Sequence, residues 1–181
     1  MAEQRVIYEH AVDALFNRTL GKRLSEKAKE RLKAAGLDVK RIDRPVPQPI
    51  YKECLRIAME EVYPSLEPGE AALQLGKDLA NGYIHTMQGK AAAALTRMLG
   101  PRRSLPRMTQ NLRSANNFVE TTLKELGNGR YEVTINEHHG YPRYIEGGLV
   151  TVLPLSGAKN VRVRTLSADA HRGTYLIEWD E

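Results

Sequence analysis

The spacing of apolar residues changes its period once along the chain, and this change constrains the fold more than any other feature. Up to residue 126 the apolar residues recur every three or four positions, which is the spacing of an amphipathic helix. After Gly127 they alternate with polar residues, as in a half-buried strand. A mainly helical part at 1–126 followed by a strand-rich part at 127–181 predicts an α+β fold, because both kinds of element must bury their apolar faces.

Turn and cap residues divide the helical part into segments. The pattern from residue 5 to 20 predicts a helix or a short strand leading into one. Ser25 can cap a second helix, and Gly36 suits the left-handed position just past its end. Three prolines in 44–50 predict an extended connector. Further helical stretches are predicted at 50–62, from Pro68 onwards and at 90–99, the last ending at Gly100–Pro101.

A long helix is predicted from Leu105 to about Leu126, with the Ser104 hydroxyl as its cap. Its apolar residues fall at steps of three or four: Met108, Leu112, Ala115, Val119, Leu123 and Leu126. Each large apolar side chain buried there contributes roughly 1.5–3 kcal/mol. We therefore expect this helix to be the main core element.

The second part predicts a β-α-β-β unit. Strands are expected at Arg130–Asn136, 160–166 and 174–179, with a helix that Pro142 begins and Pro154 ends. Gly147–Gly148 is expected to let that helix lie close to the sheet. The prediction is an N-terminal helical bundle packed on a small antiparallel sheet, within a single domain of residues 1–181.

Length and composition are those of an ordinary globular protein. The chain has 181 residues, of which 41% are hydrophobic and 27% charged, so it can bury a core without disulfides. Its one cysteine, Cys54, lies in a helical pattern and predicts a buried small hydrophobe in a reducing, cytoplasmic protein. No run approaches the roughly 18 apolar residues of a membrane span.

Arginines gather in the segment 96–118, which contains no acidic residue. They are Arg97, Arg102, Arg103, Arg107 and Arg113. Guanidinium groups near a helix start suit a phosphate or carboxylate, which predicts an anion site or a surface for a partner. Ordinary surface arginines paired with acids elsewhere are the other interpretation. A net charge of +5 keeps a third one open, nucleic-acid or cyclic-dinucleotide binding through 97–113.

Motifs for catalysis are missing from the sequence. It has no phosphate-binding loop, dinucleotide fingerprint, nucleophile elbow or kinase signature. The five histidines lack metal-ligand spacing, and His138–His139 is an adjacent pair in a predicted loop. We therefore expect no catalytic residues, no metal and no cofactor, although an acid–base pair assembled only by the fold stays open. Candidate acids for such a pair are Glu137, Glu146 and Asp169.

Several segments together resemble a known family. They read YEHAVDALFNRTLG, RLKAAGLDV, LGKDLANGYIHTMQGKA, MLGPRRSLPRMTQNLRSANNF, YPRYIEGGLVTVL and YLIEW. In this order they resemble an uncharacterised, largely myxobacterial family of paralogous proteins. The C-terminal pattern is also similar to the superfamily of 4-vinyl-reductase-like, TRAPP and haem-NO-binding domains. The chain lacks the proximal histidine and Tyr-x-Ser-x-Arg motif of the haem-binding branch and the zinc cysteines of some vinyl-reductase-like domains.

The resemblance implies a non-enzymatic regulatory or sensory module that binds a small anionic or apolar ligand or a protein partner. By analogy with the superfamily, a homodimer is a further expectation. The residues predicted to bind lie in the arginine segment and at the start of the last helix. They are Arg102, Arg103, Arg107, Arg113, Asn116, Asn117, Tyr141, Arg143 and Tyr144.

Overall fold

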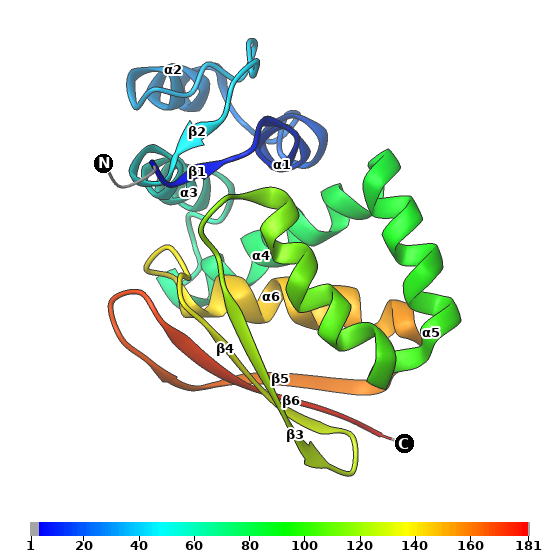
Figure 1. The fold of residues 1–181 in the computed structure, drawn as a ribbon. Coiled ribbons are helices and arrows are strands. Elements are labelled where there is room, and N and C mark those ends of the chain that lie inside the picture. Colours follow the sequence, from blue (N-terminus) through cyan, green and yellow to red (C-terminus); the bar gives the residue numbers. More distant parts are fainter. Residues whose placement is uncertain (1–3, 181) are drawn as a thin grey trace.

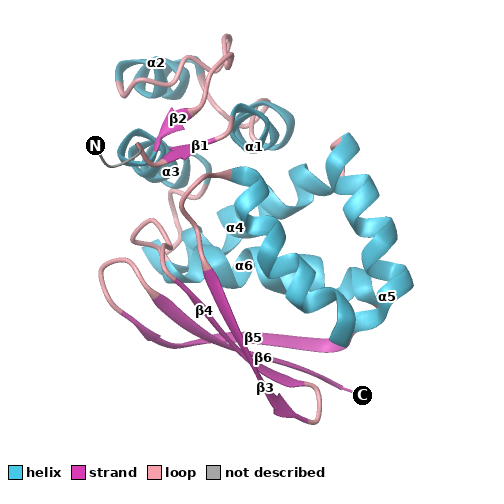
Figure 2. Ribbon diagram, in the orientation of Figure 1, coloured by secondary structure: helices cyan, strands magenta, loops and turns pink. Residues whose placement is uncertain are grey.

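The computed structural model describes residues 4–180, apart from the side chain of Asn111. It confirms an α+β fold in which helices and an antiparallel sheet form separate layers (Figures 1 and 2). The N-terminal helices and a two-stranded ribbon lie at one end, and a four-stranded sheet lies at the other. Helices α4 (Pro68–Ile84) and α6 (Pro142–Val152) run between these two layers (Figure 1).

The N-terminal layer forms where local signals predicted it. Strand β1 (Val6–Ile7) leads into α1 (Glu9–Asp13) and a π-helical segment, η1 (Ala14–Thr19). Helix α2 (Glu26–Ala34) begins at Ser25, whose Oγ accepts a hydrogen bond from the Ala28 N–H at 3.1 Å. Strand β2 (Val46–Pro47), in the predicted connector, pairs with β1 and leads into α3 (Gln48–Val62). The predicted cap and connector are thus confirmed.

Helix α5 (Met87–Asn111) bends sharply at Gly100, whose φ of 73° is outside the helical range. This bend confirms the predicted end of the first helical run at Gly100–Pro101. The two arms of α5 point in different directions (Figure 1), and the second arm passes into a 3-10 turn, η2 (Leu112–Ala115). The chain therefore returns towards the N-terminal layer before it enters the sheet.

The predicted helix from Leu105 to Leu126 is wrong beyond Ala115. Residues Thr121–Gly127 form strand β3, which pairs antiparallel with β4 (Arg130–Ile135) through the predicted turn at Gly127–Gly129. The Ser104 hydroxyl is not a cap, because it donates to the Pro101 carbonyl from within the helix at 3.2 Å. Thr121 and Thr122 are β-branched and favour a strand. The spacing of four residues between Val119 and Leu123 fits one face of a helix and also one face of a strand.

The sheet has the strand order β3-β4-β6-β5, and every neighbouring pair is antiparallel. Strands β5 (Lys159–Ala168) and β6 (Gly173–Asp180) confirm the two predicted C-terminal strands. Between β4 and β5 lie α6 and a 3-10 turn, η3 (Leu153–Ser156), which contains Pro154. With β3 added, the predicted β-α-β-β unit becomes β-β-α-β-β.

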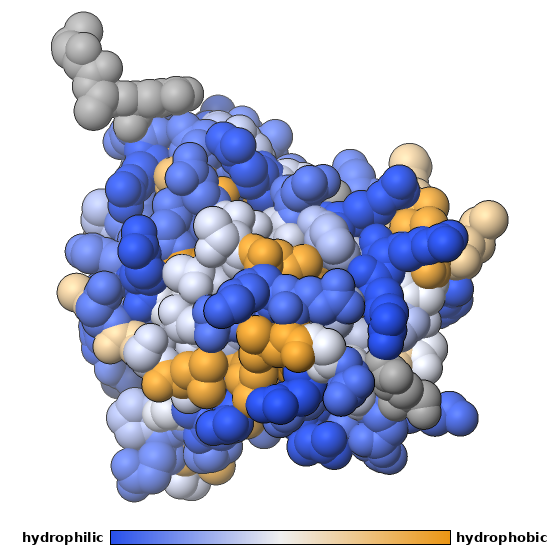
Figure 3. All heavy atoms as spheres, turned by 60° about the horizontal axis from the view of Figure 1, so that its bottom comes forward, coloured by the Kyte–Doolittle hydropathy of each residue, from blue (hydrophilic) through white to orange (hydrophobic). Residues whose placement is uncertain are grey.

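The buried apolar residues form two clusters. We call the first the N-terminal core, which joins η1, α2, α3 and α4 through residues such as Phe16, Leu32, Leu55 and Leu75. The second, the sheet core, lies between one sheet face and α6, with Val133, Ile135, Leu149 and Tyr175 among its members. Helices lie on one face of the four-stranded sheet (Figure 2). The view with the sheet end forward shows a mainly hydrophilic surface with several apolar patches near its centre (Figure 3).

Helices α4 and α6 pack closely because glycines meet backbone at their crossing. A Cβ atom on Gly147 would lie 2.0 Å from the Leu73 carbonyl oxygen of α4. The expectation that Gly147 allows close approach to the sheet is therefore wrong, since this residue faces a helix. A Cβ on Gly148, its neighbour, would meet no atom within 4 Å.

Candidate functional site

A cavity of about 220 Å³ lies where the N-terminal core and the sheet core meet. Its walls come from α4, both arms of α5, α6 and the end of β1, and its lining is mostly apolar. Residues of both cores take part, for example Tyr51 and Tyr144 from the first and Ile135 and Leu149 from the second. The cavity is therefore a site between the two halves of the fold.

Small side chains leave this space unfilled. The helical walls carry glycine or alanine where a core would ordinarily carry leucine or isoleucine. These positions are Ala11, Ala80, Ala92, Ala93, Ala115 and Gly148. Gly76 and Gly89 also line the cavity, but a Cβ atom on either would meet backbone atoms. Glycine costs about 1 kcal/mol in a helix interior. At Gly148 the missing side chain leaves open space rather than a close contact, so this residue contributes directly to the volume.

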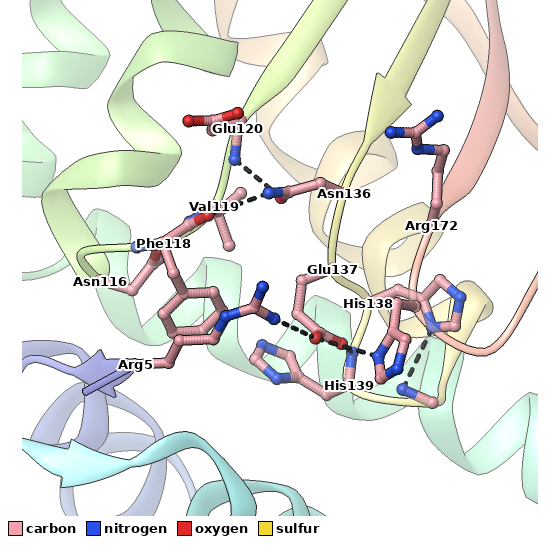
Figure 4. A network of polar contacts seen from close by, with 12 residues as sticks. Arg5, Asn116, Phe118, Val119, Glu120, Asn136, Glu137, His138, His139 and Arg172 are labelled. Carbon is pink, nitrogen blue, oxygen red and sulfur yellow. Dashed lines mark hydrogen bonds and ion pairs between the residues drawn. The ribbon is translucent and has the colours of Figure 1, made fainter. Parts of the chain in front are cut away.

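One end of the cavity carries polar groups from the loop after β4 (Figure 4). Glu137 is only 2% exposed, and its Oε1 accepts a hydrogen bond from the His139 N–H at 2.7 Å. Its Oε2 has no hydrogen-bond partner. Two further groups lie near Oε2, namely the Arg5 guanidinium, with Nη1 at 3.6 Å, and the His171 imidazole, with Nδ1 at 3.4 Å. Oε2 therefore lies within ion-pair distance of Arg5 but accepts no hydrogen bond.

His139 is the second polar group at this end, and it sits among aromatic rings. Its ring centroid lies 5.3 Å from that of Tyr51, 6.1 Å from Phe118 and 6.2 Å from Tyr144. Burial lowers the pKa of His139 to about 4, against the opposing charge of Glu137. The imidazole is therefore neutral at pH 7. Its Nδ1 is buried and makes no hydrogen bond.

His138 differs from His139, since both of its ring nitrogens have partners. Its Nδ1 accepts from the Gly140 N–H at 3.1 Å, and its Nε2 lies 3.1 Å from the Asp169 carbonyl oxygen. An accepting Nδ1 requires the proton on Nε2, which can then donate to that carbonyl. His138 therefore holds the loop to the β5–β6 connection.

Tyr51 and Tyr144 form a buried pair on the cavity wall. Their hydroxyl oxygens are 3.0 Å apart and share one hydrogen bond. Burial raises the pKa of Tyr51 to about 12 and the pKa of Tyr144 well above its usual value. Both phenols are therefore neutral at physiological pH, and the pair joins α3 to α6 across the N-terminal core.

The predicted arginines do not line this cavity. Arg102 and Arg103 lie beside Lys159 and Asp180 at the bend of α5, and Arg113 lies beside Glu120 and Arg172. The four predicted arginines of the segment 96–118, Arg107 included, are exposed. The structure spreads them over separate surfaces, and their role in binding an anion stays a prediction.

Asn116 and Asn117 hydrogen-bond to backbone. Asn116 Oδ1 accepts from the N–H groups of Phe118 at 3.1 Å and Val119 at 2.7 Å, which ends the helical segment. Asn117 Oδ1 accepts from the Val6 N–H, and its Nδ2 donates to the Gln4 carbonyl, both at 2.9 Å. These bonds tie β1 to the segment before β3, and Asn116 also borders the cavity.

The predicted residues at the start of α6 are placed differently from one another. Tyr141 is partly buried against the N-terminal core. Arg143 forms ion pairs with Glu70 of α4 and Glu146 of α6. Tyr144 alone of the three lines the cavity. Its binding role stays a prediction.

The sequence did not single out Glu137 and His139 as binding residues. The available signal was a run of polar residues directly after an alternating strand, followed by Gly140. Within residues 4–180 no group of three potential metal ligands is present. In the same range no helix is long and apolar enough to cross a bilayer.

Comparison with protein families matches residues 5–180 to a single family model, described as proteins of unknown function, DUF2378. The chain belongs to the DUF2378 family. No curated protein matches this DUF2378 chain. The predicted relationship to an uncharacterised family is confirmed by the match to this family model.

Solved structures of H-NOX proteins share the fold of this DUF2378 chain. A variant of Tt H-NOX has a TM-score of 0.72 at 12% identity, covering 97% of this chain and 96% of that one. The H-NOX protein from S. oneidensis in the Fe(II)NO ligation state has a TM-score of 0.66 at 10% identity, with coverage of 97% and 100%. An oxygen-binding H-NOX domain related to soluble guanylate cyclases has a TM-score of 0.65 at 10% identity, with coverage of 97% and 96%.

Proposed function

We propose that this DUF2378 protein is a non-enzymatic sensory module whose cavity binds a small, mainly apolar ligand. The observation that carries the proposal is the unfilled apolar space between the two cores, lined by small residues. Apolar cavities with a few polar groups at one end are the usual form of a small-molecule site. A ligand there contacts both halves of the fold at once.

The similar H-NOX structures support a sensory role. One of those proteins is an oxygen-binding domain in its oxygen complex and another is in an Fe(II)NO ligation state, so they bind small molecules on a domain of this fold. A shared fold alone does not transfer a ligand. The identity of the ligand has to come from the residues of this chain.

Haem does not fit the residues that line this cavity. Among the described lining residues, His139 is the one histidine, and it comes from a loop. An iron-bound imidazole normally donates its second N–H to a carbonyl or carboxylate, whereas Nδ1 of His139 has no partner. The described lining contains Glu137 but neither lysine nor arginine to balance the carboxylates of a haem. We therefore propose a ligand other than haem.

Binding of this ligand can change the stability of the contact between the two cores. A molecule that binds only the folded protein stabilises it by RT ln(1 + [L]/Kd), about 2.7 kcal/mol at a hundredfold excess over Kd. Because the cavity spans both cores, that free energy strengthens their contact. We propose that a protein partner binds the ligand-bound and ligand-free forms with different affinities. Several expectations stay predictions. They are the protein partner, a homodimer, a cytoplasmic location, a restriction to myxobacteria and a relationship to 4-vinyl-reductase-like and TRAPP domains.

Native mass spectrometry of the gently purified protein, beside its denatured mass, tests the proposal. We expect a non-covalent mass excess in the wild type and its loss in Gly148→Leu, because the leucine side chain enters the cavity. Gly148→Ala is the matched control, since a methyl group leaves most of the space open. Two results together would count against a ligand site and favour a protein-interaction module. The first is a clean apo mass in the wild type. The second is that the thermal stabilities of the wild type and of Gly148→Leu are the same in cell extract as in buffer.

A further inference from the structure

Two buried polar atoms at the end of the cavity are left without hydrogen bonds, namely Glu137 Oε2 and His139 Nδ1. Leaving a buried acceptor or donor unpaired is costly, and native proteins rarely do so without a reason. Both residues line the cavity, and both are over nine-tenths buried. The pair therefore marks the position where a bound molecule supplies the missing partners.

We infer that the ligand is an uncharged apolar molecule with a hydroxyl group, which Glu137 and His139 hold at the polar end of the cavity. This inference rests on the proposed function and adds the chemical class of the ligand. A carboxylate oxygen only accepts, so its partner must donate. A hydroxyl group has one proton, which it donates to Glu137 Oε2, and its oxygen can then accept a hydrogen bond from His139 Nδ1 when the neutral ring carries its proton on that nitrogen.

The charges around this end argue against an ionic head group. Glu137 would repel a carboxylate or phosphate, and no lysine or arginine is among the described residues that line the cavity. Arg5 lies 3.6 Å from the same Oε2, and Lys52 lies near enough to lower the pKa of His139. These cations, with His171 when protonated, would repel an ammonium group. An uncharged donor meets neither repulsion.

The apolar walls of the cavity indicate the chemistry of the ligand beyond its hydroxyl group. Ring edges of Tyr51, Phe118 and Tyr144 surround His139, and the far walls are the small residues of α4, α5 and α6. Flat ring systems pack well against such surfaces. Three two-ring probes separate the possibilities: 1-naphthol donates and accepts, 1-methoxynaphthalene only accepts, and 1-naphthoate is an anion.

The test measures the Kd of each probe by fluorescence titration of the intact protein at pH 7. We expect 1-naphthol to bind about tenfold or more tightly than 1-methoxynaphthalene, because hydrogen bonds to charged groups are the stronger kind. We expect 1-naphthoate to bind weakest. In Glu137→Gln an amide N–H₂ group can replace the free acceptor, so the preference for 1-naphthol should vanish or reverse. Glu146→Gln, which changes a buried carboxylate outside the cavity lining, should keep it.

Each contrary result has a distinct meaning. Equal Kd values for 1-naphthol and 1-methoxynaphthalene in the wild type, with binding that Gly148→Leu abolishes, would overturn the hydroxyl inference and keep the cavity as a ligand site. A tenfold preference that survives in Glu137→Gln would also overturn it. Absence of binding by all three probes, or binding that Gly148→Leu leaves unchanged, would overturn the inference and the proposed function together. The wild-type comparison needs no variant, so a misfolded Glu137→Gln cannot leave the question open.

Discussion

Gly76 of α4 and Gly147 of α6 each face the backbone of the opposite helix where these two helices cross. A Cβ on Gly76 would lie 2.0 Å from the Tyr144 carbonyl oxygen, just as a Cβ on Gly147 would lie 2.0 Å from that of Leu73. This crossing sets the distance between the N-terminal core and the sheet core. It therefore also sets the width of the cavity beside it.

The adjacent glycines of α6 should respond in opposite ways to alanine. Gly147→Ala forces α4 and α6 apart and should destabilise the protein by about 1–3 kcal/mol, the usual cost of overpacking. Gly148→Ala adds a methyl group in open space and should stabilise it by about 0.5–1 kcal/mol, because alanine is the better helix former. Urea unfolding measures both. Similar effects of the two substitutions would contradict the described crossing.

The hydroxyl pair of Tyr51 and Tyr144 should behave as one unit. Tyr51→Phe or Tyr144→Phe leaves a buried hydroxyl without its partner and should cost about 1–3 kcal/mol of unfolding free energy. The double variant should cost less than the sum, since neither unpaired group remains. A double-mutant cycle by urea unfolding checks this, and strictly additive effects would show that the 3.0 Å contact contributes nothing.

Stability should decrease as the pH is lowered, because of His139. Burial lowers its pKa to about 4, whereas the ring titrates near 6.5 in the unfolded chain. Between these values the unfolded state binds the proton and the folded state does not, so folding weakens as pH falls, by at most about 1.4 kcal/mol for each pH unit. Once the pH is below the folded-state pKa, this group adds no further loss.

The control for that prediction is His139→Phe, which keeps an aromatic ring among Tyr51, Phe118 and Tyr144. Urea unfolding at pH 7, 5.5 and 4.5 should show a shallower decline for this variant than for the wild type. Parallel declines in the two proteins would mean that His139 is not held neutral by burial.

Cys54 should be inert to thiol reagents in the folded protein. It is fully buried, as predicted from the sequence, and burial raises the pKa of its thiol to about 12. Because the thiolate is the reactive form, labelling should require unfolding. Ellman's reagent should detect one thiol per chain in urea and almost none in buffer. Rapid labelling in buffer would show that this part of α3 opens readily.

The predicted helix from Leu105 to Leu126 failed at positions where one spacing of apolar residues fits two structures. Val119 and Leu123 are four residues apart, which suits a helix face and equally one face of a strand. Asn116 decides between them, because its side chain binds the following N–H groups and ends the helix. The pairing of β3 with β4 then orders Thr121–Gly127 as a strand. Such pairing depends on residues that a local pattern does not include.

The cavity could not be predicted for a related reason. Its lining joins Ile7, Tyr51, Gly76 and Ile135, which are far apart in the chain. The alanines and glycines around it are also common helix residues, so they carry no distinct signal. The sequence offered Glu137 only as a candidate acid and His139 only as a loop histidine, and what marks them is that Glu137 Oε2 and His139 Nδ1 are buried without hydrogen bonds.

Local spacing by itself determined the α+β class, the Ser25 cap, the break at Gly100 and the strands β4, β5 and β6. These features depend on backbone preferences and on which face of a helix or strand is apolar, and residues close together in the sequence determine both. The tertiary structure decided the extra strand β3, the α4–α6 crossing and the cavity. Those features depend on contacts between distant residues, where packing and desolvation set which side chains are paired and which are left free.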